Sequence, residues 1–240
     1  MSKFRNLANV ISMEIRGFFN DLDVVWTAAE VLSDIAEWSK LPKSISQVVR
    51  EILADDLVQE SYKFYLAGSV GIDAVTAVAS LAIAVAEEAT VELIDHATPQ
   101  ASKLLETMMF LLNSDLSSRT FNFWASFAEA SVDGDESIAE PWLQKVLGIT
   151  LERTCWRDDL DHEEWSAYRT DVVEVFEGLS EVLSPEILNT SVASHLDMTA
   201  NGYDAQAKIV VCSQFLATIF ILDLGDGLVL FNLHQDQFYP

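Results

Sequence analysis

The sequence predicts an all-α fold, either a compact bundle or a solenoid of paired helices. Helix-breaking residues are scarce, because 240 residues contain only nine Gly and five Pro. Apolar residues recur in steps of three and four, the spacing that places them on one side of an α-helix. Half of the residues are hydrophobic, which is enough to bury a large core. Together these features predict helices of about 12 to 22 residues joined by short polar connections.

The first half of the chain contains four predicted helices. The first spans 21–38 and ends before Pro42, and the second spans 45–66. The third, 73–94, is apolar almost all round, which is typical of a helix packed between neighbours. The fourth starts at Pro99, because proline is favoured in the first turn of a helix. The apolar faces expected for the first and fourth helices are Val25, Ala28 or Ala29, Leu32, Ile35 and Trp38, and Leu104, Met108, Leu111 and Leu112.

The second half contains four more predicted helices. One spans 115–130, and its aromatic residues occupy more than one face, as expected for a helix buried between two layers. The next begins at Pro141, and the third, 161–183, has the clearest amphipathic pattern in the chain. Pro185 ends that helix and opens the fourth. The apolar positions of the third are Trp165, Tyr168, Val172, Val175 or Phe176, Leu179, and Val182 or Leu183.

Pairs of predicted helices recur about every 40 to 50 residues, the period of HEAT-type repeats. This period favours the solenoid, so we expect residues 1–194 to form HEAT-like antiparallel helix pairs. The tail, 195–240, differs in pattern, because two apolar runs rich in β-branched residues flank a Gly-Asp-Gly turn at 225–227. For this tail we expect a helix to about residue 220 and then an irregular or hairpin end. A helix continuing through 204–222 is the alternative.

The formal net charge of −24 limits the classes of partner. It arises from 38 acidic residues against 14 Lys and Arg, and it would repel nucleic acids and anionic membranes. An acidic surface raises the association rate of basic partners, although a large charge also serves solubility. The longest apolar runs, 74–86 and 209–222, are shorter than the about 20 residues that span a bilayer. We therefore expect a soluble intracellular protein with no membrane insertion.

No pattern of catalytic or metal-binding residues is visible in the sequence. Cys155 and Cys212 are far apart and have no CxxC spacing, so neither a disulfide framework nor a zinc site is expected. The four histidines show no HExxH spacing, and no GxSxG or Gly-rich phosphate loop occurs. We therefore expect no enzyme activity, no cofactor and no metal. The larger aromatic residues are expected in the core between helices: Phe121, Phe123, Trp124, Trp142 and Trp165.

Acidic residues cluster where the chain leads into the predicted helix 161–183. Carboxylates suit Mg²⁺, but the DDxxD pattern fails because His162 stands where the last aspartate is needed. Acids before a helix also interact favourably with its dipole. Two interpretations stay open: a solvated loop, or a rim that binds a basic partner. The candidate partner-binding residues are Asp158, Asp159, Asp161, Glu163 and Glu164.

Two motifs lie on separate predicted helices. Thr120, Phe121, Phe123 and Trp124 fit a Ser/Thr–aromatic–x–Phe–Trp pattern that follows a leucine-rich helix. Tyr168, Arg169, Asp171 and Val172 fit an aromatic–Arg–x–Asp–hydrophobic pattern reached through an acidic loop. In this order and separation the motifs resemble the importin-β superfamily, and they are most similar to its transportin-SR and importin-13 branch. The resemblance covers about residues 104–188.

The resemblance implies a central HEAT-repeat segment of a nuclear transport receptor, or karyopherin. Such a segment would recognise basic protein cargo and the small GTPase Ran, contact nucleoporins, and shuttle between cytoplasm and nucleus. In that family the second helix of each pair lies on the concave side, which would place Asp158, Asp159 and Asp161 on its rim. The alternatives are a general HEAT-repeat scaffold without transport activity and an α-helical, Mg²⁺-dependent enzyme that uses the acid cluster.

Overall fold

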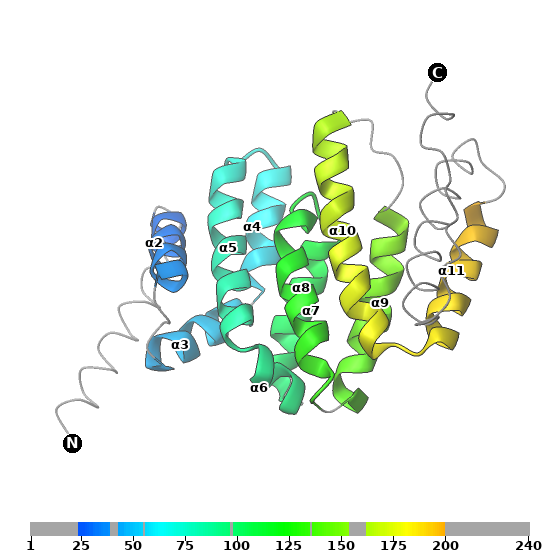
Figure 1. Ribbon diagram of the computed structural model, residues 1–240. Helices are drawn as coiled ribbons and strands as arrows, with labels where there is room; N and C mark the ends of the chain where they lie inside the picture. The colour runs from blue at the N-terminus through cyan, green and yellow to red at the C-terminus, as the bar shows by residue number, and fades with distance from the viewer. Residues whose placement is uncertain are drawn as a thin grey trace.

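The computed structural model describes residues 24–38, 43–54, 56–96, 98–134, 136–153 and 162–199, and these ranges consist mostly of helices joined by turns, with no strand among them (Figure 1). The prediction of an all-α fold is confirmed for this part of the chain. The elements are α2 (Val25–Trp38), α3 (Lys43–Leu53), α4 (Leu57–Leu66), α5 (Ile72–Glu88), α6 (Thr90–Asp95), α7 (Pro99–Leu112), η1 (Ser117–Thr120), α8 (Phe121–Ser131), α9 (Glu136–Arg153), α10 (His162–Val182) and α11 (Pro185–Thr199).

The helices lie in two rows. In the first row α2 packs on α5, α5 on α8, and α8 on α10. In the second row α3 and α4 contact α7, α7 contacts α9, and α9 contacts α11. The rows meet where α4 and α7 pack on α5, and where α9 packs on α8 and α10. Figure 1 shows the resulting progression of helices, with α2 at one end and α11 at the other.

The helix α5 is the most enclosed element of the first row. It contacts α2, α3, α4, α7 and α8, which explains why almost all of its surface is apolar. The prediction of a helix packed between neighbours is therefore confirmed for this segment. The predicted continuation to residue 94 is wrong, because a turn at Ala89 separates α5 from α6. The Thr90 hydroxyl donates to the carbonyls of Ala86 and Glu87, at 3.2 and 2.9 Å.

The single helix predicted over 45–66 is also wrong, because α3 ends at Leu53 and α4 begins at Leu57. Asp56 between them has a φ of 60°, in the left-handed region, which a continuous right-handed helix cannot contain. Gly68, with a φ of 70°, then ends α4. Its amide donates to the Tyr65 carbonyl at 2.8 Å, and the next amide, of Ser69, donates to the Phe64 carbonyl at 2.9 Å.

Two further expectations at helix ends have different outcomes. Thr98 caps α7 by accepting a hydrogen bond from the Ala101 amide at 3.1 Å, so the predicted start at Pro99 is confirmed. The start predicted at Pro141 is wrong, because α9 begins at Glu136. Pro141 falls in the second turn of α9, and Ala139 before it and Leu143 after it are both fully buried in the core. Packing outweighs the cost of proline there.

The buried face of α2 differs from the expected one. Val25, Ala29 and Leu32 are buried as predicted, but Ile35 is 41% exposed. Ser33 is buried in its place, at 4% exposure. The helix α2 packs chiefly on α5, so its contact face is narrow and follows Val25, Ala29 and Ser33 in steps of four.

The core between the rows is rich in aromatic residues, as predicted. Phe123, Trp124 and Phe127 of α8 are fully buried, and neighbouring ring centroids lie 4.9 to 5.8 Å apart. Trp142 is only partly buried. The side chain of Trp165 lies outside the described part of the chain. The stripe predicted for α7 is buried throughout: Leu104, Met108, Leu111 and Leu112.

The expected boundary at residue 194 falls within α11. The expected tail beyond residue 199, with its Gly-Asp-Gly turn, lies outside the described residues. Within the described ranges, no helix combines the length and apolarity that crossing a membrane requires.

Candidate protein-binding surface

Charged residues are divided unequally between the two rows of helices. In the first row, α2 and α5 contain three acidic residues each, α8 contains one and α10 contains six. These four helices carry a single Lys or Arg, which is Arg169 of α10. In the second row, Lys or Arg occurs on α3, α4, α7 and α9. The first row is therefore the strongly acidic part of the described helices.

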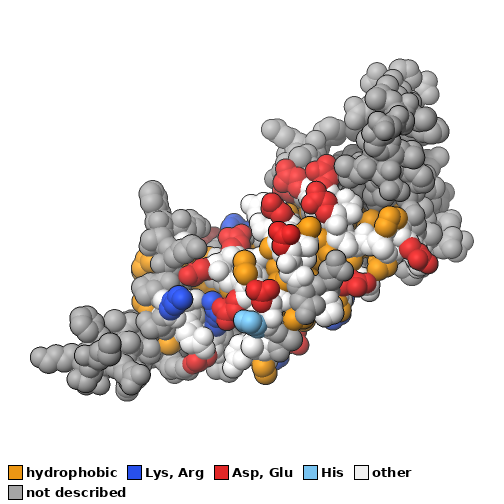
Figure 2. Space-filling view, turned by 60° about the horizontal axis from the view of Figure 1, so that its bottom comes forward, with side chains coloured by type: hydrophobic (Ala, Val, Ile, Leu, Met, Phe, Trp, Pro, Cys, Tyr) orange, Lys and Arg blue, Asp and Glu red, His pale blue; other side chains and the backbone are white. Residues whose placement is uncertain are grey.

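Most acidic side chains of the first row are exposed and have no ion-pair partner among the described residues. On α10, Glu174, Glu177 and Glu181 follow one another in steps of three and four, so they form one exposed stripe. Figure 2 shows one side of the molecule, where Asp and Glu side chains are more numerous than Lys and Arg. We call the exposed, unpaired carboxylates of the first row the acidic surface: Glu30, Asp34, Asp73, Glu129, Glu174, Glu177 and Glu181.

The ion pairs of the described residues involve other elements. Arg50 of α3 lies 2.7 Å from Glu92 of α6. Lys103 of α7 lies 3.0 Å from the carboxylate of Glu106 and 3.7 Å from that of Asp56. The hydrogen bond to Glu106, followed by the charge of Asp56, raises the pKa of the Lys103 ammonium group. These cations belong to second-row helices, and none of their ion pairs within the described residues involves a carboxylate of the acidic surface.

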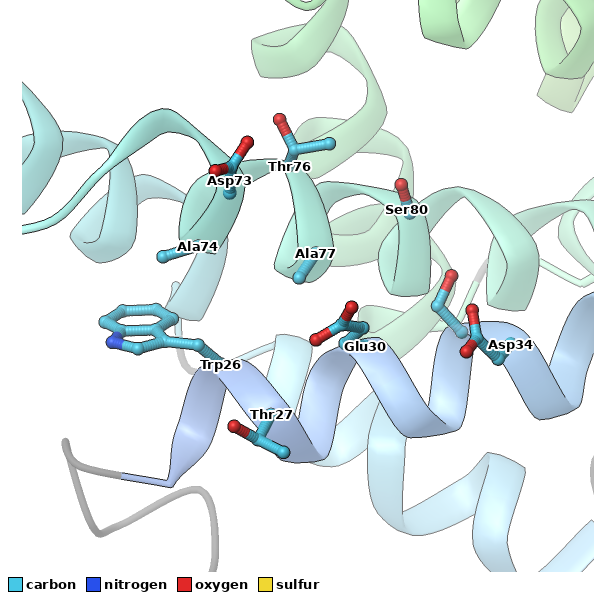
Figure 3. Close-up of a pocket in the computed structure, with 10 residues that line it drawn as sticks. Trp26, Thr27, Glu30, Asp34, Asp73, Ala74, Thr76, Ala77 and Ser80 are labelled. Atoms are coloured by element: carbon cyan, nitrogen blue, oxygen red, sulfur yellow. The ribbon is translucent and has the colours of Figure 1, made fainter.

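A groove of about 440 Å³ lies between α2 and α5, at the end of the acidic surface that is farthest from α10 (Figure 3). The Glu30 side chain extends from α2 toward Ala77 of α5, and the Trp26 ring lies at one end of the groove. Asp73, at the start of α5, lines it from the opposite helix. The lining residues are Trp26, Thr27, Glu30, Ser33, Asp34, Asp73, Ala74, Thr76, Ala77 and Ser80.

The acid cluster predicted from the sequence is only partly within the described residues. Asp158, Asp159 and Asp161 lie outside them. Glu163 and Glu164 fall in the first turn of α10, but their side chains are not described. The predicted binding rim therefore stays a prediction, although its described part belongs to the acidic first row.

Other residues singled out in the sequence do not form a reactive site in the described ranges. His96 is exposed just after α6, far along the chain from the other histidines. Cys155, Cys212 and His234 lie outside the described residues. Among the residues that are described, no three His, Cys, Asp or Glu side chains are placed to hold one metal ion.

The acidic surface is not among the features predicted from the sequence, although the sequence contains a signal for it. The segments that become α2, α5 and α8 contain no Lys or Arg at all. That depletion is visible in the sequence, but its meaning depends on knowing that these helices pack side by side. The α2–α5 groove likewise cannot be predicted without knowing that these two helices pack together, because Trp26 and Asp73 are distant in sequence.

The chain matches no family model, no curated protein and no solved structure. The resemblance to karyopherins therefore stays a prediction from the two motifs.

Proposed function

We propose that the chain is a protein-recognition segment of a nuclear transport receptor, and that it binds a basic partner across the acidic surface. The observation that carries this proposal is the concentration of unpaired carboxylates on α2, α5, α8 and α10. Partners that present Lys and Arg would be attracted over several ångströms and would bind faster at low ionic strength. Binding of this kind requires no chemistry and therefore no catalytic residue.

The finer fold in this proposal is a solenoid of HEAT-like antiparallel pairs. Its support is the packing of helices two or three apart along the chain, α2 on α5 and α8 on α10, in one row. The two karyopherin-like motifs also meet in space. The rings of Phe121, from the first motif, and Tyr168, from the second, lie 5.4 Å apart in an edge-to-face contact. One structural unit therefore contains both motifs.

In this proposal the partners are basic cargo proteins, Ran and nucleoporins, and the protein shuttles between cytoplasm and nucleus. Cargo would be released because Ran binds best to a conformation of the receptor that has a lower affinity for cargo. The second candidate function, a HEAT-repeat scaffold, shares the acidic surface but requires no Ran. Saturable, GTP-dependent binding of purified Ran is expected for the karyopherin. Binding of the basic partner without Ran binding would favour the scaffold.

The acidic surface itself is tested with a pair of variants of equal charge. The face variant, Glu174→Gln/Glu177→Gln/Glu181→Gln, removes the α10 stripe. A control variant changes three acids of the second row, Glu140→Gln/Glu152→Gln/Glu186→Gln. Affinity for a short oligolysine peptide is measured at several salt concentrations by fluorescence anisotropy.

We expect the face variant to bind the oligolysine peptide several-fold more weakly and with a shallower salt dependence, while the control variant changes little. Equal weakening by both variants would mean that only net charge matters. Charge reversal at Asp158, Asp159, Asp161, Glu163 and Glu164 tests the predicted rim in the same assay. Unchanged binding by that variant would remove the rim from the binding surface.

A further inference from the structure

The helix α2 has two apolar stripes, and its contact with α5 covers only one of them. Val25, Ala29 and Leu32 form the covered stripe and are buried. The second stripe lies beside the first and follows steps of four and three, so its side chains share one side of the helix. The second stripe consists of Val24, Ala28, Val31 and Ile35.

The fold covers this second stripe incompletely. Val24 and Ala28 are partly buried, whereas Val31 is 50% and Ile35 is 41% exposed. Because Val31 and Ile35 are four positions apart, their side chains are neighbours on the helix surface and form one apolar strip. The helix α2 is also the first described helix and lies at one end of the first row (Figure 1). A further helix could therefore pack along this strip.

The sequence that precedes α2 contains a matching stripe. Within residues 1–20, which lie outside the described part of the chain, large apolar side chains recur in steps of three and four. A helix over 4–19 would be about 24 Å long, similar to the about 21 Å expected for the 14 residues of α2. The apolar side of such a helix would consist of Phe4, Leu7, Ile11, Ile15 and Phe18.

Charge favours this segment over the other candidate occupants of the strip. Residues 1–20 contain three Lys or Arg and one Glu, while α2 contains three acidic residues and no Lys or Arg. Opposite charges attract, whereas a second copy of this chain would bring a net charge of −24 to the same helix. The segment 200–240 contains four acids and one Lys, and it follows α11 at the opposite end of the molecule (Figure 1).

We infer that residues 4–19 form a helix that packs antiparallel to α2 and covers its second apolar stripe. Only five residues connect this segment to α2, and connections of this length join antiparallel neighbours. The short connection also sets the register, in which Ile15 lies against Val31 and Ile11 against Ile35. The inference is independent of the proposed function, because it holds whatever partner the acidic surface binds.

Disulfide cross-linking in the full chain tests this register, after both native thiols are removed by Cys155→Ser/Cys212→Ser. The facing pair is Ile11→Cys/Ile35→Cys. The matched control pair, Met13→Cys/Ile35→Cys, moves one thiol by two positions, to the opposite side of the proposed helix. Disulfide formation under mild oxidation is followed by mass spectrometry of tryptic peptides, and circular dichroism spectra establish that each variant keeps its helical content.

We expect the facing pair to form an intramolecular disulfide about tenfold faster than the control pair, because two thiols held in contact have a high effective concentration. Equal rates would overturn the inference, since a segment that does not dock brings both positions to α2 equally often. Disulfides that join two molecules would also overturn it, in favour of a second copy on the strip.

Hydrogen exchange provides a second readout that needs no cysteine. Amides of residues 4–19 should exchange about tenfold more slowly in the wild type than in Val31→Asp, because a carboxylate at the centre of the contact would release the segment. Val91→Asp is the matched control, because Val91 is 65% exposed and belongs to α6, and this variant should exchange like the wild type. Equally fast exchange of 4–19 in all three proteins would overturn the docking.

Discussion

Replacing Gly178 by alanine should destabilise the fold, although the same change at an exposed helical glycine is stabilising. Gly178 lies inside α10, where this helix packs on α8. A Cβ atom there would lie 3.3 Å from the Cβ of Ala128 and 3.5 Å from the carbonyl oxygen of Ala125. Ala128 is fully buried and α8 also contacts α5, α6 and α9. The Ala128 Cβ and the Ala125 carbonyl oxygen therefore cannot move away from the new methyl group without disturbing these other contacts.

The magnitude follows from two opposing terms. Alanine is favoured over glycine in a helix interior by about 1 kcal/mol. Added volume at a tight core contact typically costs about 1–3 kcal/mol. We expect Gly178→Ala to lower the free energy of unfolding by about 1 kcal/mol. Gly148 of α9 is the matched control, because a Cβ there meets no atom within 4 Å. Gly148→Ala should raise the free energy of unfolding by about 0.5–1 kcal/mol.

Urea denaturation followed by circular dichroism measures both changes, and unchanged m-values would show that the compactness of the unfolded state is preserved. The difference between the two variants, about 2 kcal/mol, corresponds to roughly 4–8 °C in Tm for a chain of this size. Equal stabilisation by both substitutions would refute the close approach of α8 and α10 at Gly178.

Four further outcomes are expected, all measured as changes in the free energy of unfolding. Gly68→Ala should cost about 1–2 kcal/mol, because alanine disfavours the left-handed conformation that ends α4; no loss would contradict that helix end. Gly134→Ala should cost more than about 1 kcal/mol, because its Cβ would overlap the buried Ile94 side chain, and a neutral result would place the two residues farther apart. Trp124→Phe should stay within about 1 kcal/mol of the wild type, since it removes a buried indole N–H that has no partner among the described residues; a loss above about 2 kcal/mol would imply that this group is paired. Added NaCl should stabilise the fold by screening the net charge of −24 while it weakens binding of the oligolysine peptide, and destabilisation by salt would mean that ion pairs dominate over repulsion.

The features that depend on local chemistry could be predicted from the sequence. The Thr98-Pro99 pair predicted the start of α7, and the apolar steps from Tyr168 to Leu179 predicted the buried face of α10. Each signal involves residues within a few turns of one another, so no tertiary information is needed.

The features that depend on which helices meet could not be predicted. Periodicity shows that a helix has a buried face, but it does not identify the helix that covers that face. The apolar pattern of α2 predicts a buried Ile35, but Ile35 is exposed and Ser33 is buried. The reason is that α2 packs on α5 alone among its main contacts, and this contact covers positions that the apolar pattern does not identify. The break at Asp56 was missed for another reason: the left-handed conformation is unusual outside glycine, so the sequence carries no strong signal for it.

The placement of charge supports the proposed binding of a basic partner, and it is not what solubility alone would require. Acids that serve only solubility can be spread over any exposed helix and interleaved with lysine. Here the first-row helices have almost no Lys or Arg, while most helices of the second row carry one or two. On α10 the like charges of Glu177 and Glu181 are four residues apart, a spacing that costs a helix about 0.2–0.5 kcal/mol. A surface that keeps such repulsion without compensating cations among the described residues supports the proposed basic partner, because its Lys and Arg side chains would relieve the repulsion.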